Sequence, residues 1–441
     1  MFSPNLLGFS KGPAHIKSKE VKLNDYWKIV NIPLDIPSNT AINNIKSFLS
    51  EIVAIEIPSS LMCNCNCLYC YIREKWLKNT LVTVEEIKKI TELSWKHILC
   101  FDDDNKKEKV ISSWGAEPFC NVPTLDYLVD FCIDNKMIIN FSTNGTILNE
   151  SIKKMIYKYY KNCVEKNMPI KSFQISLDGP KNIQDKYRPM YSGESNYDHV
   201  IKFIDFLEEV QRELGICQQL YSLCSTIYLS DSEEESLQIY KESIDFFTNK
   251  SERRFYNPIL PIRIENSKNF TKKDADLFYK IIETSTEFLI EKSEKVKEGF
   301  LDNYASKLFL DSGRIDGWPR CSAMNTQVSV DIDGTLYPCH GPITTSFLKP
   351  FLAFGNLIDG IIDYRRFISV LDGIYSDITF KSVCKNCEIG KTCAGNICFS
   401  CTPVALANNY EPVNFNIHMC NIFQKCFPLW KKQYEQFLKF K

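Results

Sequence analysis

The stretch Leu61-Met-Cys-Asn-Cys-Asn-Cys-Leu-Tyr-Cys-Tyr71 places four cysteines within eight residues, directly after a short apolar run. Three of them, Cys63, Cys67 and Cys70, have the spacing C-x3-C-x2-C, and Cys65 lies between the first two. Cysteines spaced so closely are typical of a metal site. Three thiolates on a 4Fe-4S cluster leave one iron without a protein ligand, and that iron is then available to a small molecule.

Two other interpretations of these cysteines stay open. A structural zinc site needs four ligands in closed tetrahedral geometry, and Cys65 would have to be the fourth. A disulfide knot would need an oxidising compartment, which a chain without a signal-peptide pattern gives no reason to expect. The other cysteines also lie far away in the sequence.

Composition excludes several classes of protein. The chain has 441 residues, 44% of them hydrophobic, which is enough to bury a large core. Its 53 basic and 54 acidic residues form no long run of one sign, so we expect no nucleic acid and no anionic membrane as partner. No apolar run is long enough to span a bilayer. The 19 cysteines gather at metal-ligand spacings, which predicts a reducing, cytoplasmic location.

Beyond residue 50 the chain alternates between apolar runs and amphipathic stretches. Residues 51–58 are rich in β-branched side chains and end at a proline, as a short strand does. A helix is predicted to begin at Thr83, since Thr83 and Glu86 form a capping-box pattern. Further apolar runs cover residues 110–114, 137–141, 173–177, 223–228 and 255–262, and amphipathic stretches cover 125–132, 150–160, 197–214 and 232–247. Six strands that each precede a helix predict a parallel sheet, with reactive groups on the loops at the carboxyl ends of its strands.

These loops resemble a known family. The cysteine spacing, with the aromatic Tyr69 before the last cysteine, resembles the defining motif of the radical S-adenosylmethionine (SAM) superfamily. Trp114-Gly-Ala-Glu-Pro118 resembles the GGEP segment of that family, although Ala116 replaces the second glycine and loses its freedom to adopt positive φ. In the family this segment holds the methionine amino group of SAM, which implies that role for Gly115, Ala116, Glu117 and Pro118.

Two later loops carry the same resemblance. Ser142-Thr-Asn-Gly-Thr146 follows the third strand, and Ile175-Ser-Leu-Asp-Gly-Pro180 with Asp185-Lys-Tyr-Arg188 follows the fourth. By resemblance Arg188 pairs with the carboxylate of SAM, a bidentate role that suits a guanidinium. A polar helix-entry loop and a solvated arginine are the alternatives. The remaining candidate SAM-binding residues are Tyr69, Ser142, Asn144, Ser176 and Asp178.

The resemblance also implies the chemistry. A reduced 4Fe-4S cluster with SAM on its open iron donates one electron and cleaves the sulfonium bond. The products are methionine and a 5'-deoxyadenosyl radical, which takes a hydrogen atom from a substrate. The protein then has to position the substrate C–H bond and exclude water.

Cysteines return near the C-terminus in a different arrangement. Cys321 is followed by twelve residues and then Gly334-Thr-Leu-Tyr-Pro-Cys339, and seven further cysteines follow from Cys384 to Cys426. The set resembles the SPASM extension of the superfamily, which usually holds two auxiliary 4Fe-4S clusters. By resemblance the first auxiliary cluster is held by Cys321, Cys339 and Cys398, and the second by Cys384, Cys387, Cys393 and Cys420.

The SPASM resemblance has two departures. Four residues separate Cys393 from Cys398 where the pattern has three, so Cys398 and Cys401 compete for one role. Residues 322–327 lack the extra cysteine of some relatives. The first auxiliary cluster then keeps an open iron unless Cys401 fills it. A pair of zinc ribbons is the alternative for the whole set.

His340, directly after Cys339, is the candidate catalytic residue, because an imidazole accepts a proton near neutral pH. A hydrogen bond to a cluster sulfur is the alternative role. Cys65 and Cys426 are interpreted as spare thiols. The cysteines in or beside apolar segments are expected to be small buried hydrophobes; they are Cys100, Cys120, Cys132, Cys163, Cys217 and Cys224.

The fold expected from these observations is α/β, a partial (β/α)6 TIM-type barrel with a C-terminal iron-sulfur SPASM domain. The expected parts are an N-terminal extension at 1–50, the radical SAM barrel at 51–265, a helical bridge at 266–315 and the SPASM domain at 316–441. The extension predicts a strand or hairpin and a helix, and it is short for a leader-binding winged-helix domain.

Relatives with a SPASM domain mostly modify peptides or proteins. The resemblance therefore implies a radical SAM oxidoreductase that matures a ribosomally synthesised precursor peptide, by a thioether or carbon–carbon crosslink or by another C–H oxidation. It implies a reducing electron donor of the flavodoxin or ferredoxin type. The alternatives are sulfatase-maturase-like formation of formylglycine and a non-enzymatic carrier of electrons with several clusters.

Overall fold

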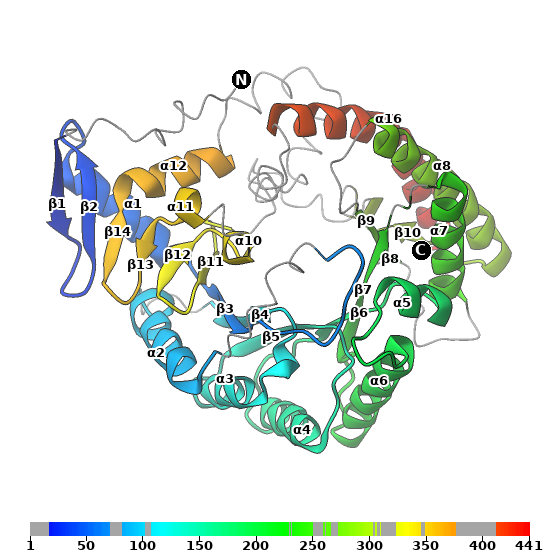
Figure 1. The fold of residues 1–441 in the computed structure, drawn as a ribbon, viewed down its shortest axis with the longest axis horizontal. Coiled ribbons are helices and arrows are strands. Elements are labelled where there is room, and N and C mark those ends of the chain that lie inside the picture. The colour runs from blue at the N-terminus through cyan, green and yellow to red at the C-terminus, as the bar shows by residue number, and fades with distance from the viewer. Residues whose placement is uncertain are drawn as a thin grey trace.

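The computed structural model describes residues 17–70, 82–101, 107–228, 230, 232–249, 259–260, 262–265, 272–302, 305–306, 309, 323–344, 349–375 and 412–441. One sheet of 12 strands curves through these residues (Figure 1). Its strands, in spatial order, are β1 (Ser18–Lys22), β2 (Lys28–Pro33), β14 (Ile361–Asp363), β13 (Gly355–Asn356), β12 (Thr335–Tyr337), β11 (Gln327–Val330), β3 (Ala54–Ser60), β4 (Val110–Gly115), β5 (Ile138–Thr143), β6 (Phe173–Ser176), β7 (Tyr221–Tyr228) and β9 (Ile262–Glu265).

The six strands β3, β4, β5, β6, β7 and β9 are neighbours in chain order, and each pairs in parallel with the next. Helices follow the strands and lie on the outer side of the curved sheet (Figure 1). The predicted partial (β/α)6 barrel is therefore confirmed. The strand expected at 255–262 lies largely outside the described residues, and β9 is the sixth strand. The helices of the barrel are α2 (Val84–Ser94), α3 (Val122–Asp134), α4 (Glu150–Glu165), α5 (Lys181–Tyr187), α6 (Asn196–Glu213) and α7 (Glu233–Thr248).

Local sequence signals fix where these helices begin. The Thr83 hydroxyl accepts a hydrogen bond from the Glu86 N–H at 3.2 Å, and the Glu86 carboxylate accepts one from the Thr83 N–H at 2.8 Å. This is the predicted capping box, which satisfies two otherwise unpaired donors. Asn149, Ser195 and Ser232 cap α4, α6 and α7 in the same way through a single side chain each.

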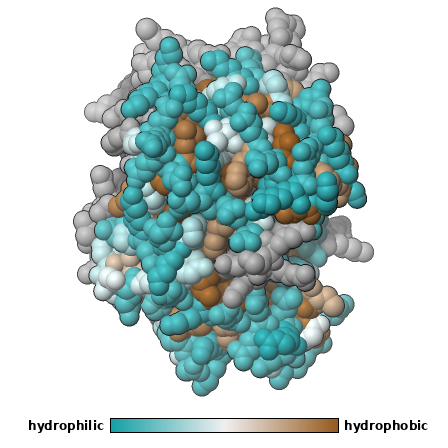
Figure 2. Space-filling view, turned by 90° about the vertical axis from the view of Figure 1, so that its right-hand side faces the viewer, coloured by the Kyte–Doolittle hydropathy of each residue, from teal (hydrophilic) through white to brown (hydrophobic). Residues whose placement is uncertain are grey.

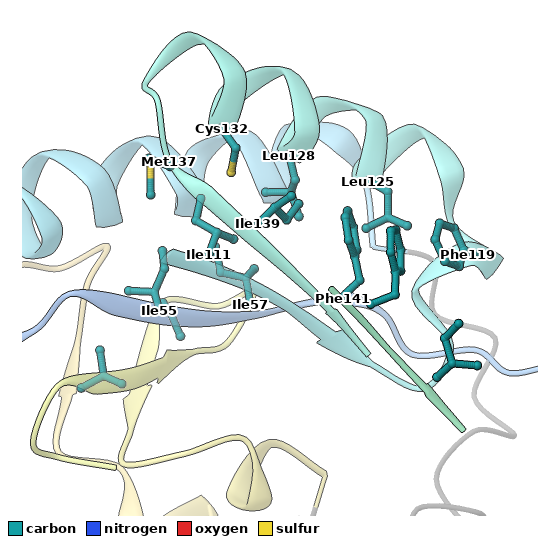
Figure 3. Close-up of a cluster of buried hydrophobic side chains, with 14 of the residues drawn as sticks. Ile55, Ile57, Ile111, Phe119, Leu125, Leu128, Cys132, Met137, Ile139 and Phe141 are labelled. Carbon is teal, nitrogen blue, oxygen red and sulfur yellow. The ribbon is translucent and has the colours of Figure 1, made fainter. Parts of the chain in front are cut away.

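The main core lies between the sheet and its outer helices. Ile55, Ile57, Ile111 and Ile139 point from three adjacent strands toward the helix that carries Leu125 (Figure 3). All five side chains are fully buried or nearly so. Burial of each such side chain contributes about 1.5–3 kcal/mol. Because side chains alternate along a strand, the residues between them face the inside of the barrel.

An aromatic cluster supports the loops at the carboxyl ends of the strands. The Phe141 and Phe173 rings stack with centroids 4.8 Å apart, and Phe119 lies within 6.0 Å of Phe141 and 5.7 Å of Phe203. Phe119 belongs to η3 (Pro118–Cys120), a single turn that directly follows Glu117. The buried ring therefore anchors the loop after β4 to the core.

Segments from both ends of the chain extend the barrel sheet at β3. β11 pairs in parallel with β3, and β2 pairs in parallel with β14. β1 and β2 form the expected hairpin, and α1 (Ser38–Glu51) is the expected helix. β3 would otherwise be the open edge of the barrel sheet, and these strands cover it. The further short elements are η2 (Trp95–Leu99), α10 (Gly341–Thr344), α11 (Lys349–Leu352) and α12 (Tyr364–Tyr375).

At the other edge of the barrel, α8 (Lys272–Val296) packs against α16 (Pro412–Leu438) around a second core that includes Ile282, Cys426 and Trp430. Gln433 on α16 donates to Thr286 at 2.8 Å and to Asp302 at 3.0 Å, all in buried positions. β10 (Leu301–Asp302) pairs there with β8 (Ile259–Leu260). Figure 2 looks at the side that carries α7 and α8, whose coloured surface is mainly hydrophilic. None of the described helices has the length and hydrophobicity to cross a membrane.

The buried-cysteine prediction is partly correct. Cys132 and Cys163 are buried in the barrel core, as predicted. Cys426, interpreted from the sequence as a spare thiol, is buried in the second core. Cys217 is exposed on the loop before β7, so the prediction was wrong for it. Cys100, Cys120 and Cys224 are half-buried.

Candidate active site

The cysteine loop leaves the carboxyl end of β3 and is held against the segment after α5. The Asn66 N–H donates to the Pro189 carbonyl at 2.7 Å, and the Leu68 N–H donates to the Tyr187 carbonyl at 3.0 Å. Cys65 and Met190 form an antiparallel bridge. These main-chain contacts bring the cysteines beside the segment that carries Arg188.

Cys63 and Cys70 both act electrostatically on the Cys67 thiol. Burial raises the pKa of the Cys67 thiol to about 12; the Arg188 guanidinium opposes this shift, and the nearby Cys63 and Cys70 thiols add to it. Within the described ranges, no three His, Cys, Asp or Glu side chains converge at metal-binding distance. The thiols would therefore have to turn toward a cluster when they bind it. Three thiols on one short loop, one of them close to a cation, are a chemically suitable donor set for iron, since a bound metal holds cysteine as thiolate.

Cys65 contacts two side-chain amides and lies beside Cys63. Its sulfur accepts hydrogen bonds from the Asn144 and Asn196 side-chain amides, each at 3.3 Å. The Cys65 N–H in turn donates to the Cys63 sulfur at 3.3 Å. The Asn144 amide also lies 3.5 Å from the Cys63 sulfur, so these contacts do not distinguish Cys63 from Cys65, and the ligand set Cys63, Cys67 and Cys70 stays a prediction.

The loop after β4 is fixed to the cysteine loop and to the loop after β5. The Ala116 N–H donates to the Ser60 carbonyl at 3.0 Å, and the Glu117 N–H donates to the Met62 carbonyl at 2.8 Å. The Glu117 carboxylate is fully buried and accepts from the Thr143 hydroxyl at 2.7 Å and the Asn144 N–H at 2.6 Å. Burial raises the pKa of Glu117 to about 7, although these hydrogen bonds oppose the shift.

The Glu117 side chain therefore joins two of the predicted SAM-binding loops. The neighbours of Glu117 in this loop have different positions. Gly115 ends β4 opposite Ser60, and Pro118 is buried at the start of η3. A direct contact of these residues with SAM stays a prediction, to be made by the backbone rather than by the buried carboxylate.

Asp178 connects three parts of the site. One carboxylate oxygen, Oδ1, accepts from the Thr226 N–H on β7 at 2.9 Å. The other, Oδ2, accepts from Arg188 Nε at 2.8 Å and from the Tyr69 hydroxyl. Arg188 also lies over the Tyr69 ring, with its guanidinium carbon 5.2 Å from the ring centroid. Asp178 thus fixes Tyr69, beside the predicted ligand Cys70, to the arginine that the sequence assigns to the SAM carboxylate.

This network is buried and charged. Burial acts to lower the pKa of Arg188, but the Asp178 carboxylate outweighs burial and raises that pKa well above its ordinary value. Burial and the Asp178 charge raise the pKa of Tyr69, while Arg188 opposes the rise. The contact between Asp178 and Arg188 uses Nε, so the two terminal nitrogens of the guanidinium lie outside it.

Two predicted SAM-binding residues lie on the inner side of the barrel strands. Ser142 is exposed and donates to the Gln174 side-chain oxygen at 3.1 Å. Ser176, at the end of β6, is half-buried and is the register partner of Cys224 on β7. Asn144 lies instead in the loop group, against Cys65.

His340 contacts a residue that sequence reasoning missed. Its N–H donates to Glu56 Oε2 at 3.0 Å, and its Nδ1 lies 3.1 Å from Glu56 Oε1. The Ser329 hydroxyl also donates to Glu56. Burial acts to raise the pKa of Glu56, but the charge of His340 and these hydrogen bonds outweigh it and lower that pKa. A signal was present in the sequence, since Glu56 is a carboxylate in the middle of an apolar strand.

Of the predicted auxiliary-cluster ligands, Cys339 lies in the described residues, half-buried beside His340. Cys420 belongs to α16 by its backbone. The others lie outside the described residues: Cys321, Cys384, Cys387, Cys393 and Cys398, together with the competing Cys401. The auxiliary clusters and the domain boundaries therefore stay predictions.

The first strand of this parallel barrel leads into a cysteine loop, and the loops that follow carry an arginine, carboxylates and amides. This arrangement is typical of enzymes that bind a metal cluster and a small charged cofactor at the carboxyl ends of the strands. The family model described as the radical SAM superfamily matches residues 57–221, which contain all of these loops. Residues 57–221 therefore carry a radical SAM domain, and the protein is an enzyme that binds a 4Fe-4S cluster and SAM.

Several relatives are similar to this chain. The radical SAM cyclopropyl synthase TigE of Paramaledivibacter caminithermalis is 23% identical over 363 residues, 78% of this chain and 67% of that protein. The uncharacterized protein MJ0907 of Methanocaldococcus jannaschii is 27% identical over 214 residues, 48% of this chain and 66% of that protein. The solved structure of native anSMEcpe with bound AdoMet has a TM-score of 0.58 at 17% identity and covers 87% of this chain and 99% of that chain. At that identity the likeness supports the fold.

Proposed function

We propose that this enzyme uses the 5'-deoxyadenosyl radical to take a hydrogen atom from a peptide substrate, and that the product is a crosslinked peptide. The Asp178 network, which ties the cysteine loop to Arg188, supports radical formation at this site. The peptide substrate is proposed from the shared fold of native anSMEcpe, whose solved structure holds AdoMet and the Cp18Cys peptide. Similarity to a cyclopropyl synthase favours a new carbon–carbon bond over a thioether, because a cyclopropyl ring is closed by carbon.

Different residues of this chain would hold the cluster and SAM. Cys63, Cys67 and Cys70 would hold the cluster, which with SAM supplies the radical. The guanidinium of Arg188 would bind the SAM carboxylate through its terminal nitrogens, while Asp178 keeps Nε in place. Two charge-assisted contacts on one guanidinium orient the bound molecule as well as holding it.

His340 is the proposed catalytic side chain. Glu56 fixes both its backbone and Nδ1, which directs the other ring nitrogen, Nε2, away from Glu56. The substrate loses one hydrogen atom to the radical, and a crosslink requires the loss of a second hydrogen as a proton and an electron. His340 would take the proton, and the auxiliary clusters proposed for the C-terminal cysteines would take the electron.

Formation of formylglycine is the second candidate. It rests on the fold shared with anSMEcpe, and that likeness alone does not define a reaction. The radical SAM domain at residues 57–221 argues against the non-enzymatic electron carrier. Both remaining candidates need an external reductant, for which we propose a flavodoxin or ferredoxin.

The test is co-expression of the enzyme with the short open reading frames beside its gene, followed by mass spectrometry of each peptide. A crosslink removes two hydrogen atoms and suppresses fragmentation between the joined residues. Formylglycine instead gives an aldehyde that reacts with a hydrazide. A modified peptide of neither kind, or none with an enzyme that cleaves SAM, would refute the proposal.

A further inference from the structure

The inner side of the barrel carries a row of uncharged polar side chains, of which Ser142 is the one predicted to bind SAM. Ser112 on β4 is the register partner of Asn140 on β5. Two residues further along β5, Ser142 is the register partner of Gln174 on β6, and Gln174 is the register partner of Ser222 on β7. Register partners in a parallel sheet point to the same face, and so do alternate residues of one strand. We call these five residues the inner belt.

The inner belt is accessible although it crosses the middle of the sheet. Ser142, Gln174 and Ser222 are exposed, and Ser112 and Asn140 are half-buried. The opposite face at the same level is packed with isoleucine and phenylalanine against the helices (Figure 3). Strands of a parallel sheet are normally hydrophobic on both faces, and a closed barrel is filled by bulky side chains. A polar and accessible inner row therefore indicates a surface that receives a ligand.

Part of the hydrogen-bonding capacity of the belt is already used. Ser142 donates to Gln174 Oε1 at 3.1 Å, and Ser222 donates to the Phe173 carbonyl at 3.3 Å. In the described part of the chain, the Asn140 carboxamide and the Gln174 amide nitrogen have no hydrogen-bond partner. A primary amide offers two N–H donors and a carbonyl acceptor.

The chemistry of the belt selects a class of ligand. It contains no cation, so it does not suit a phosphate or a carboxylate, which bind to arginine or lysine. Neutral amides and hydroxyls match the alternating N–H and C=O groups of a peptide main chain. The belt crosses four strands, which spans about 14 Å, the length of about four residues of extended chain.

The belt also leads to the proposed catalytic side chain. Ser112 is the register partner of Glu56 on β3, and Glu56 holds His340. A chain segment that lies along the belt therefore ends next to His340.

We propose that the inner belt binds the main chain of the substrate segment that contains the reacting residue, with the Asn140 and Gln174 carboxamides as its principal contacts. This inference rests on the proposed function, because it assumes a peptide substrate. The inner belt would then recognise the backbone of the substrate, and other parts of the enzyme would select the substrate side chains.

The test uses the full-length chain with reconstituted clusters and SAM, and a random pool of acetylated octapeptide amides as the probe. Peptide retained with the protein on ultrafiltration is measured for the wild type and for an Asn140→Leu, Gln174→Met double variant, whose side chains keep the size but not the hydrogen bonds. Loss of two hydrogen bonds should lower retention about tenfold. A pool with N-methylated backbones should be retained about as weakly by the wild type.

Gln218→Met is the matched control, since Gln218 lies on an exposed loop and donates to the Ile170 carbonyl. It should retain the pool like the wild type. An unchanged unfolding midpoint of the double variant shows that its fold is intact. Equal retention by wild type and double variant, equal retention of both pools, or no retention by the wild type would overturn the inference. Formation of 5'-deoxyadenosine by the same wild-type preparation tests the proposed function separately.

Discussion

Replacing Asp178 by Asn removes the negative charge at the centre of the candidate site while keeping the shape of the side chain. Arg188, whose side chain is 10% exposed, would then keep its charge without the buried carboxylate that balances it. Tyr69 and the Thr226 N–H would lose a charged acceptor in the same step.

Removal of one partner of a buried ion pair costs about 3–5 kcal/mol, because the remaining charge is left uncompensated. We expect the free energy of unfolding to fall by about that amount, toward the lower end since the amide still accepts hydrogen bonds. Denaturant unfolding of the cluster-free chain under anaerobic conditions measures it. The affinity for SAM should also fall, because Arg188 and Tyr69 are no longer held together, and titration calorimetry of the reconstituted protein measures that change.

Asp198→Asn is the control. Asp198 pairs with Lys181 in a position open to solvent, where an ion pair contributes little to stability. Its unfolding should match that of the wild type. If Asp178→Asn unfolded at the same denaturant concentration as this control, the buried ion pair would not be the link between the cysteine loop and Arg188.

Three further predictions follow from the site. Folding raises the pKa of Glu117 to about 7, so between the ordinary glutamate pKa and that value the folded state binds more protons than the unfolded state. The free energy of unfolding should therefore fall as pH rises through this window, by at most about 1.4 kcal/mol per pH unit. Glu117→Gln should flatten this pH dependence. Cys67→Ala should abolish cleavage of SAM, and Cys65→Ala should largely preserve it; the reverse result would mean that the ligand set is wrong. His340→Gln should still form 5'-deoxyadenosine but yield no peptide product, and a normal yield would refute a catalytic role.

Much of the barrel was predictable because its signals are local. The capping box at Thr83 and the apolar runs at 110–114 and 137–141 each depend on a few consecutive residues, and the structure has α2, β4 and β5 there. The site loops were predictable for the same reason, since each directly follows one of the barrel strands β3, β4, β5 and β6.

The remaining features depend on contacts between distant parts of the chain. The pairing of β11 with β3 joins Ser329 to Glu56, 273 positions apart, and no local pattern specifies such a partner. The contact between Glu56 and His340 depends on that pairing. The buried role of Glu117 was missed for a related reason, because a family motif names the residue but not the direction of its side chain.

The most direct test of radical SAM chemistry in this protein is the formation of 5'-deoxyadenosine by the wild type. The chain is reconstituted anaerobically with iron and sulfide, reduced with dithionite and incubated with SAM. We expect 5'-deoxyadenosine and methionine in equal amounts, and neither product from Cys67→Ala. An intact, reduced cluster that left SAM unchanged would contradict radical SAM chemistry in this protein.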